Sequence, residues 1–165
     1  MAENLNEPQN AAENQAQQQQ NMNMNINVTV TSPVSQLKTD RGLAKTILLS
    51  ILTLGIYSLV MDAHISEDIN VVCSRYDGKK TMNFWLLTFI VGPLTCGIGY
   101  LVWRHKLNAR MGAELKRRSI DYNFGAADYW LWCILGVLII VGPFVYLYKY
   151  LKAINLINAD FNQNG

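Results

Sequence analysis

The residues best suited to chemistry in this 165-residue sequence are four polar side chains that follow its first apolar run. Asp62, His64, Glu67 and Asp68 lie close together, and on a helix His64 would face Glu67 at i+3 and Asp68 at i+4. Such a group could bind a metal ion or relay a proton. The alternative, which we favour, is the solvated face of an amphipathic helix, because one histidine and three acids match no zinc motif. The sequence therefore predicts no metal site.

Basic residues beside the apolar runs are the second candidate site. Arg104 follows the second run, and Lys116, Arg117 and Arg118 form a short cluster farther along. These cations could hold the headgroups of anionic lipids. The alternative is that they only fix the orientation of the chain in a membrane. The cluster is short and lies near a predicted membrane segment, so we expect no nucleic-acid partner.

Motifs of known enzymes are not found in the sequence. The cysteines Cys73, Cys96 and Cys133 have no CxxC spacing and are typical of small packing residues. No Gly-rich phosphate loop follows a strand, and no GxSxG nucleophile motif occurs. The sequence predicts a protein that is not an enzyme and that needs no cofactor.

The elements that would position these residues are three long apolar segments, at 43–61, 84–103 and 129–148. The first contains one charged residue, Lys45, and the other two contain none. Twenty helical residues cover roughly 30 Å, the thickness of the hydrocarbon core of a bilayer. The fold class predicted is therefore all-α, a polytopic membrane protein with three transmembrane helices.

Glycine and proline interrupt all three segments. Gly55 lies in the first, Gly92 and Pro93 in the second, and Gly142 and Pro143 in the third. Proline in a helix interior frees a carbonyl and bends the helix, which neighbouring groups in a membrane bundle can compensate. The favoured interpretation is a set of kinks. The alternative is discontinuous helices around a substrate or ion path, as in secondary transporters.

An amphipathic stretch continues each apolar segment, so that the chain resembles three copies of one module. Each stretch has apolar residues three, four or seven apart, which places them on one helix face. This face could lie on a membrane surface or dock on a neighbouring helix. A shift of 42 residues aligns the first two copies, with TLGI at 53–56 over TCGI at 95–98. The apolar positions are Met61, Ile65, Ile69 and Val72; Trp103, Leu107, Met111 and Leu115; and Leu147, Leu151, Ile154 and Phe161.

Three stretches of the sequence carry a family resemblance: ILLSILTLGIYSL, then HISEDINVV, then SRYDGKKTMNFWLL. Together with the Gly-Pro segments they resemble a bacterial membrane family described as domain of unknown function 4234, from about Leu37 to the end of the chain. The resemblance implies a small integral membrane protein without an assigned activity. It brings no catalytic residues.

The chain divides into two parts of different composition. Residues 1–37 hold 14 Asn or Gln residues between Asn4 and Asn27 and no basic residue, which predicts a disordered tail. Residues 38–165 hold all 14 basic residues and nine acids, which predicts a helical membrane domain. With three crossings, nine basic residues lie on the side of the tail and five on the other, so we expect a cytoplasmic N-terminus.

The function favoured by these patterns is a binding or scaffolding component of the cell membrane. Its expected partners are the lipid bilayer, anionic lipids among them, and a second copy or another membrane protein, because small residues recur on helix faces. The alternative is a subunit of an oligomeric transporter or channel built from Gly-Pro broken helices.

Overall fold

The structure is a computed structural model that describes residues 36–165, and within this range it is helical without strands. The prediction of an all-helical fold is confirmed. None of the described helices has both the length and the apolar character needed to cross a membrane. The three predicted transmembrane helices are therefore not confirmed. Residues 1–35 of the predicted tail lie outside the described range.

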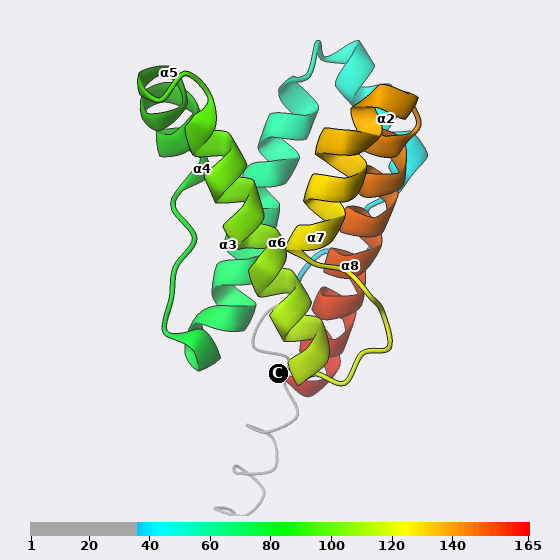
Figure 1. Cartoon of the computed structure of the whole chain (residues 1–165). Helices are drawn as coiled ribbons and strands as arrows, with labels where there is room; N and C mark the ends of the chain where they lie inside the picture. Colours follow the sequence, from blue (N-terminus) through cyan, green and yellow to red (C-terminus); the bar gives the residue numbers. More distant parts are fainter. Residues whose placement is uncertain (1–35) are drawn as a thin grey trace, which may run out of the picture. The chain divides into compact units, whose positions relative to one another are not determined.

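Each predicted span is divided by a turn, so that the chain forms three helical hairpins (Figure 1). In hairpin 1, α2 (Leu43–Leu52) and α3 (Ile56–Asp77) flank residues 53–55. In hairpin 2, the first arm comprises α4 (Phe84–Leu86), the π-helical η1 (Leu87–Val91) and α5 (Gly92–Leu94), and the second arm is α6 (Ile98–Arg117). In hairpin 3, α7 (Ala126–Asp128), the π-helical η2 (Tyr129–Ile134) and the 3-10 helix η3 (Leu135–Ile139) precede α8 (Gly142–Asn164).

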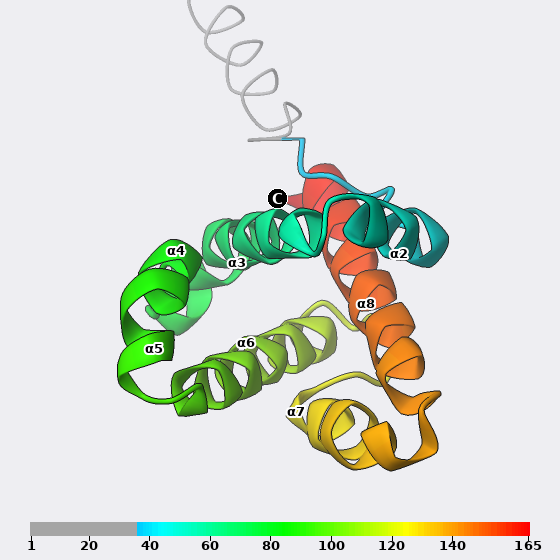
Figure 2. The ribbon, with the colours of Figure 1, turned by 90° about the horizontal axis from the view of Figure 1, so that it is seen from above.

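The core is built by the second arms of the hairpins. In the view of Figure 2, α3, α6 and α8 surround a common core, and each of the three contacts the other two. The amphipathic stretches predicted from the sequence thus dock on one another. Burial of each large apolar side chain contributes about 1.5–3 kcal/mol. The largest wholly buried side chains are Ile65, Ile69 and Val72 of α3; Leu107, Met111 and Leu115 of α6; Tyr150, Leu151, Ile154, Ile157 and Phe161 of α8; and, from a first arm, Leu87 of η1.

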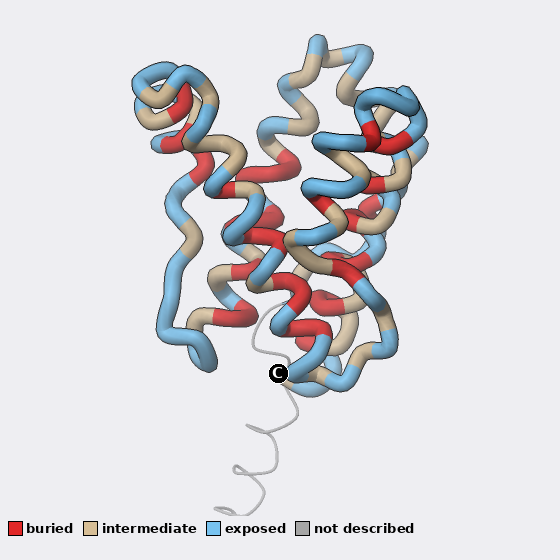
Figure 3. The backbone as a smooth tube through the Cα atoms, viewed as in Figure 1, coloured by how far each residue is buried: buried red, intermediate tan, exposed pale blue. Residues whose placement is uncertain are grey.

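The two ends of this helical unit differ. All three turns lie at the upper end in Figure 1, whereas the connections at 78–83 and 118–125 begin at the lower end, near the C-terminus. The start of the described chain is fixed along α8 toward that lower end, because Leu37 N donates to Asn162 Oδ1 at 2.7 Å. Figure 3 shows buried segments mainly in the middle and lower parts, and a mostly exposed upper end.

Candidate functional site

The upper end carries a concentration of exposed apolar side chains, which we call the apolar end. Every member is more than half exposed, and Leu54, Leu94 and Leu138 reach 94%, 81% and 87%. Monomeric soluble proteins seldom expose a large apolar patch unless it marks an interaction site. The members are Leu48, Ile51, Leu52, Leu54 and Ile56; Phe89, Ile90, Leu94 and Ile98; and Leu131, Leu135, Val137, Leu138, Ile139, Ile140 and Val141.

The turns of hairpins 1 and 2 share one backbone geometry. In hairpin 1, Gly55 N donates to Ser50 O at 2.7 Å and Leu54 N to Ile51 O at 3.2 Å. This pair of bonds is a Schellman motif, with a left-handed residue at its centre. In hairpin 2, Gly97 N donates to Gly92 O at 2.9 Å and Cys96 N to Pro93 O at 3.3 Å.

A threonine completes each of these two turns. Thr53 Oγ1 donates to Leu49 O at 2.7 Å and accepts from Tyr57 N at 2.9 Å. Thr95 Oγ1 makes the same two bonds, to Val91 O at 2.6 Å and from Gly99 N at 2.9 Å. The backbone donors of the turns are therefore satisfied within the hairpins, although the turns are surrounded by exposed apolar side chains.

The residues predicted as helix breaks lie in and around the turns. Gly55 occupies the first turn with a left-handed φ of 92°. Gly92 and Pro93 are the first residues of α5, before the second turn, whereas Gly142 and Pro143 begin α8, after the third turn. The two Gly-Pro pairs thus lie on opposite sides of their turns and do not occupy equivalent positions.

Hairpin 3 is closed by contact between two glycines. A Cβ built on Gly142 would lie 2.4 Å from the Cα atom of Gly136 and 2.5 Å from its carbonyl carbon and oxygen. The arms therefore approach backbone to backbone, which only glycine permits. This turn contains Ile140 with a φ of 61°.

A buried ion pair lies where the apolar segments end and the core begins. Arg104 binds Asp62 through both guanidinium nitrogens, at 2.9 Å to Oδ1 and 2.5 Å to Oδ2. Tyr150 donates its hydroxyl to Asp62 Oδ1 at 3.3 Å, and its ring lies 5.3 Å from the guanidinium. Two-point pairing of this kind holds α3 and α6 in a fixed register.

The predicted polar cluster is not assembled. Asp62 faces Arg104, and Asp68 faces Arg41, whose Nη2 is 2.7 Å from Asp68 Oδ2. His64 and Glu67 are exposed on the same helix. Among residues 36–165, no three His, Cys, Asp or Glu side chains come together in a way that could hold a metal ion.

The predicted headgroup cations are mostly engaged within the protein. Arg104 pairs with Asp62, while Arg117 and Arg118 both bind Glu114, with nitrogen to oxygen distances of 2.6 Å. Arg118 also binds Asp160. Lys116 is exposed, at the lower end of α6.

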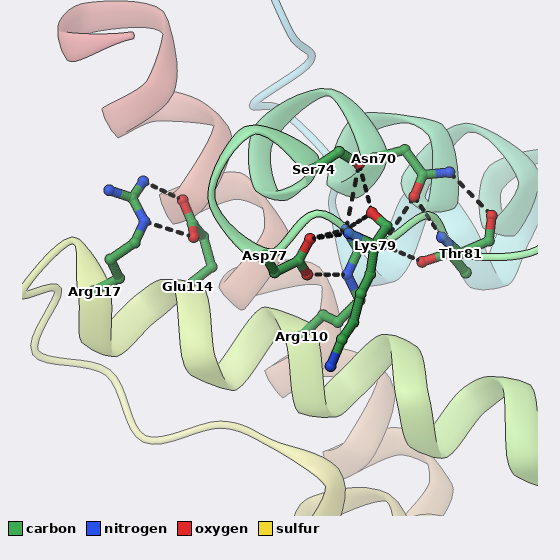
Figure 4. A network of polar contacts seen from close by, with 8 residues as sticks. All are labelled: Asn70, Ser74, Asp77, Lys79, Thr81, Arg110, Glu114 and Arg117. Carbon is green, nitrogen blue, oxygen red and sulfur yellow. Dashed lines mark hydrogen bonds and ion pairs between the residues drawn. The ribbon is translucent and has the colours of Figure 1, made fainter.

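Sequence reasoning did not single out Arg110, which organises the largest polar network (Figure 4). Its side chain binds Asp77 Oδ2 at 2.7 Å and Asn70 Oδ1 at 2.8 Å, and it donates to the backbone oxygen of Lys79 at 2.9 Å. Asn70 in turn accepts from Thr81 N at 2.7 Å. The connection after α3 is thereby held against α6. The sequence did contain a signal for this connection: within SRYDGKKT, Asp77-Gly78 predicts a tight turn after a helix.

Several ionisable groups of the lower half have shifted pKa values. Burial would raise the pKa of Glu114, but hydrogen bonds and charges from Arg117 and Arg118 outweigh it and lower the pKa below its ordinary value. For Asp77, burial is likewise outweighed by the hydrogen bond from Arg110, and the pKa is lowered. Burial raises the pKa of the Cys73 thiol to about 12, so this cysteine is protonated and unreactive at neutral pH.

Comparison with known proteins finds one family match, which covers most of the first two hairpins. Residues 41–113 match the model of a family described as Domain of unknown function (DUF4234). No curated protein and no solved structure matches the chain. The resemblance predicted from the motifs between residues 47 and 87 is confirmed over residues 41–113, and the family model does not extend over the rest of the chain.

Proposed function

We propose that this protein is a binding or scaffolding component of the cell membrane, anchored by its apolar end. The three turns would enter the hydrocarbon from one side and return to the same side, so the chain would be embedded without crossing. The lower end, with its polar connections, would remain in water and be available to partners.

The turns of hairpins 1 and 2 carry this proposal. In hydrocarbon every backbone donor needs a partner within the protein, because there is no water to supply one. The two Thr-closed Schellman turns meet this requirement while presenting only apolar side chains at their tips, such as Leu54 and Leu94. A turn exposed to water would need neither backbone donors that are all satisfied within the protein nor apolar side chains at its tip.

The lengths of the arms agree with entry into one leaflet. The helix α2 has 10 residues, which corresponds to about 15 Å, or about half of a hydrocarbon core roughly 30 Å thick. Entry to this depth places Asp62 and Arg104 near the interface. All basic residues of the described chain would then lie on one side, and this one-sided distribution of Lys and Arg favours the cytoplasmic side.

The transporter or channel alternative stays a prediction. It would require a polar path along the broken segments. Within 43–61, 84–103 and 129–148 the one charged residue is Lys45, near the beginning of the first segment. A scaffolding or binding role agrees better with this composition.

Reporter fusions test the proposed topology. Paired reporters, active only inside or only outside the cell, are attached after Gly165 and inserted after Gly78 and after Ile120. We expect all three positions to report the cytoplasm. If Gly78 reports the outside while Ile120 reports the inside, the segments cross the membrane and the one-sided anchor is wrong.

Charged substitutions at the tips test anchoring itself. A charge in the hydrocarbon costs about 2.5–3.5 kcal/mol on insertion scales, so Leu54→Asp combined with Leu94→Asp should shift protein from the membrane fraction to the alkaline-soluble fraction. Val71→Asp is the matched control, because Val71 is a 42% exposed side chain on α3 outside the apolar end. Equal retention of both variants would contradict the proposal.

A further inference from the structure

A groove runs along α6 beside the connection that follows α3. It has a volume of about 780 Å³, within the range of roughly 300–1,000 Å³ typical of small-molecule sites. The side chains of Val91, Ile98 and Val102 line its apolar part, and Lys79, Lys80 and Lys106 line its basic part.

The two parts follow one another along the helix. Ile98, Val102 and Lys106 are four residues apart and share a face of α6, with Ile98 next to the turn and Lys106 two helical turns farther on. The apolar part thus lies nearest the apolar end of the molecule, and Lys106 lies about 12 Å from Ile98 along the helix axis.

The cations of the groove are not neutralised within the described chain. Among residues 36–165, Arg41, Arg104, Arg110 and Arg118 are in ion pairs with carboxylates, whereas Lys79, Lys80 and Lys106 are in none. Three positive charges around one opening complement an anion.

The segment that carries two of these lysines is held in place. Arg110 donates to Lys79 O at 2.9 Å, Asn70 Nδ2 donates to Thr81 O at 3.1 Å, and Trp103 Nε1 donates to Met82 O at 3.0 Å. The network of Figure 4 therefore fixes the backbone on which Lys79 and Lys80 stand. A site fixed before binding loses less entropy when its ligand arrives.

We propose that this groove binds one anionic phospholipid, an inference that rests on the proposed membrane anchoring. An acyl chain would lie against Val91, Ile98 and Val102, and the phosphate would lie among Lys79, Lys80 and Lys106. The order of the two parts matches a lipid of the leaflet that the apolar end enters, with its chain directed inward and its headgroup at the interface.

Lipid binding in detergent tests this site separately from anchoring. The full chain in a neutral detergent is titrated with phosphatidylglycerol, phosphatidylcholine and inorganic phosphate, and retained lipid is measured by native mass spectrometry. We expect saturable binding of phosphatidylglycerol, at least tenfold tighter than phosphatidylcholine, with inorganic phosphate as a weak competitor.

The variant Lys79→Gln/Lys80→Gln/Lys106→Gln should weaken phosphatidylglycerol binding at least tenfold. The matched control, Lys45→Gln/Arg75→Gln/Lys152→Gln, removes the same charge from exposed positions outside the groove and should stay within twofold. Val102→Trp should weaken binding by filling the apolar part. The site is refuted if the two triple variants behave alike, if both lipids bind equally, or if inorganic phosphate displaces phosphatidylglycerol at equal concentration.

Failure of this inference and failure of the anchor give different results. If only the proposed lipid site is wrong, Lys79→Gln/Lys80→Gln/Lys106→Gln keeps the lipid selectivity of the original chain. It also remains bound to phosphatidylcholine vesicles through its apolar end. If the anchor is wrong, Leu54→Asp/Leu94→Asp stays in the membrane fraction as well as the control does, whatever the groove binds.

Discussion

Thr53 and Thr95 hold equivalent places 42 residues apart, and each closes its turn with a single hydroxyl group. The hydroxyl replaces a backbone carbonyl as the acceptor for the amide four residues later. This role explains why both copies of the repeat place a threonine two residues before the glycine of the turn. Tyr57 and Gly99, whose amides donate to the two hydroxyls, do not share a residue type, so the hydrogen bonds and not the side-chain packing are what the copies have in common.

We expect Thr53→Val to destabilise hairpin 1. The substitution keeps the shape of the side chain but leaves the Tyr57 amide without its acceptor, at a cost of about 1–3 kcal/mol. The free energy of unfolding in detergent, followed by circular dichroism, measures the loss. Thr88→Val is the control, because the Thr88 hydroxyl only donates to Phe84 O and receives no amide. A loss no greater than that of the control would mean that the Thr53 bond is dispensable.

The arginine partners of Asp62 and Asp68 were hard to predict, because they are far from these acids in the sequence. His64, Glu67 and Asp68 are within one helical turn, yet the spacing did not indicate that Asp62 and Asp68 would each bind an arginine of another segment. One signal was present. The shift of 42 residues that aligns the first two copies places Asp62 over Arg104, so opposite charges occupy the same position in neighbouring modules. A pair of this kind joins two copies that pack side by side.

At the scale of elements, the sequence predicted the second arms better than the first. The apolar faces of the stretches after each span form the core because their spacing follows the helical period. The spans were predicted to cross the membrane with kinks at their Gly and Pro residues, because an apolar run gives no period from which a full reversal of the chain could be detected. The turn residues carried only part of the information, because the left-handed position of the Schellman motif is taken by Leu54 and Cys96, and Gly55 and Gly97 come one residue later.

We expect Gly142→Ala to disrupt hairpin 3. The added methyl group would meet the backbone of Gly136 at 2.4–2.5 Å, and backbone cannot move aside as a flexible side chain can. Overpacking of this kind costs about 1–3 kcal/mol, which thermal unfolding in detergent would detect. Gly42→Ala provides the control, because nothing lies within 4 Å of a Cβ there and its φ is −102°. If the two variants unfold at the same temperature, the arms of hairpin 3 are not in close contact.

At the scale of the whole molecule, polar and apolar groups are divided between two ends. The ion pairs of Asp68, Asp77, Glu114 and Asp160 lie in the lower half, where that of Asp77 joins α3 to α6 and that of Asp160 joins α8 to the end of α6, whereas the turns of the upper end carry no charged residue. The separation of polar and apolar groups into two ends could be predicted from the sequence only in part. The sequence indicated alternating apolar and polar stretches, but whether three crossings or three hairpins result depends on which contacts form between stretches far apart in the chain.

Acid should weaken the lower half first. A carboxyl whose pKa is lowered on folding stabilises the folded state above its unfolded pKa, and this contribution is lost as the pH falls through the folded value. Glu114 and Asp77 are groups of this kind. We therefore expect the free energy of unfolding to fall between about pH 5 and pH 2. Glu114→Gln should be less stable at neutral pH and show a smaller decrease toward acid.

The control for this pH dependence is Glu67→Gln, at an exposed position on α3. Its unfolding should follow the same pH profile as the original chain. A Glu114→Gln profile as steep as that of the original chain would mean that the Arg117 and Arg118 contacts do not couple stability to protonation.

The position of all three turns at one end has a mechanical consequence. If the apolar end enters one leaflet as proposed, it adds cross-sectional area to that leaflet and none to the opposite one. A bilayer relieves such an imbalance by bending, and insertion is easier where lipid packing is already loosened by curvature. Molecules of this protein would then gather where the membrane curves, and crowding them together would itself bend the membrane.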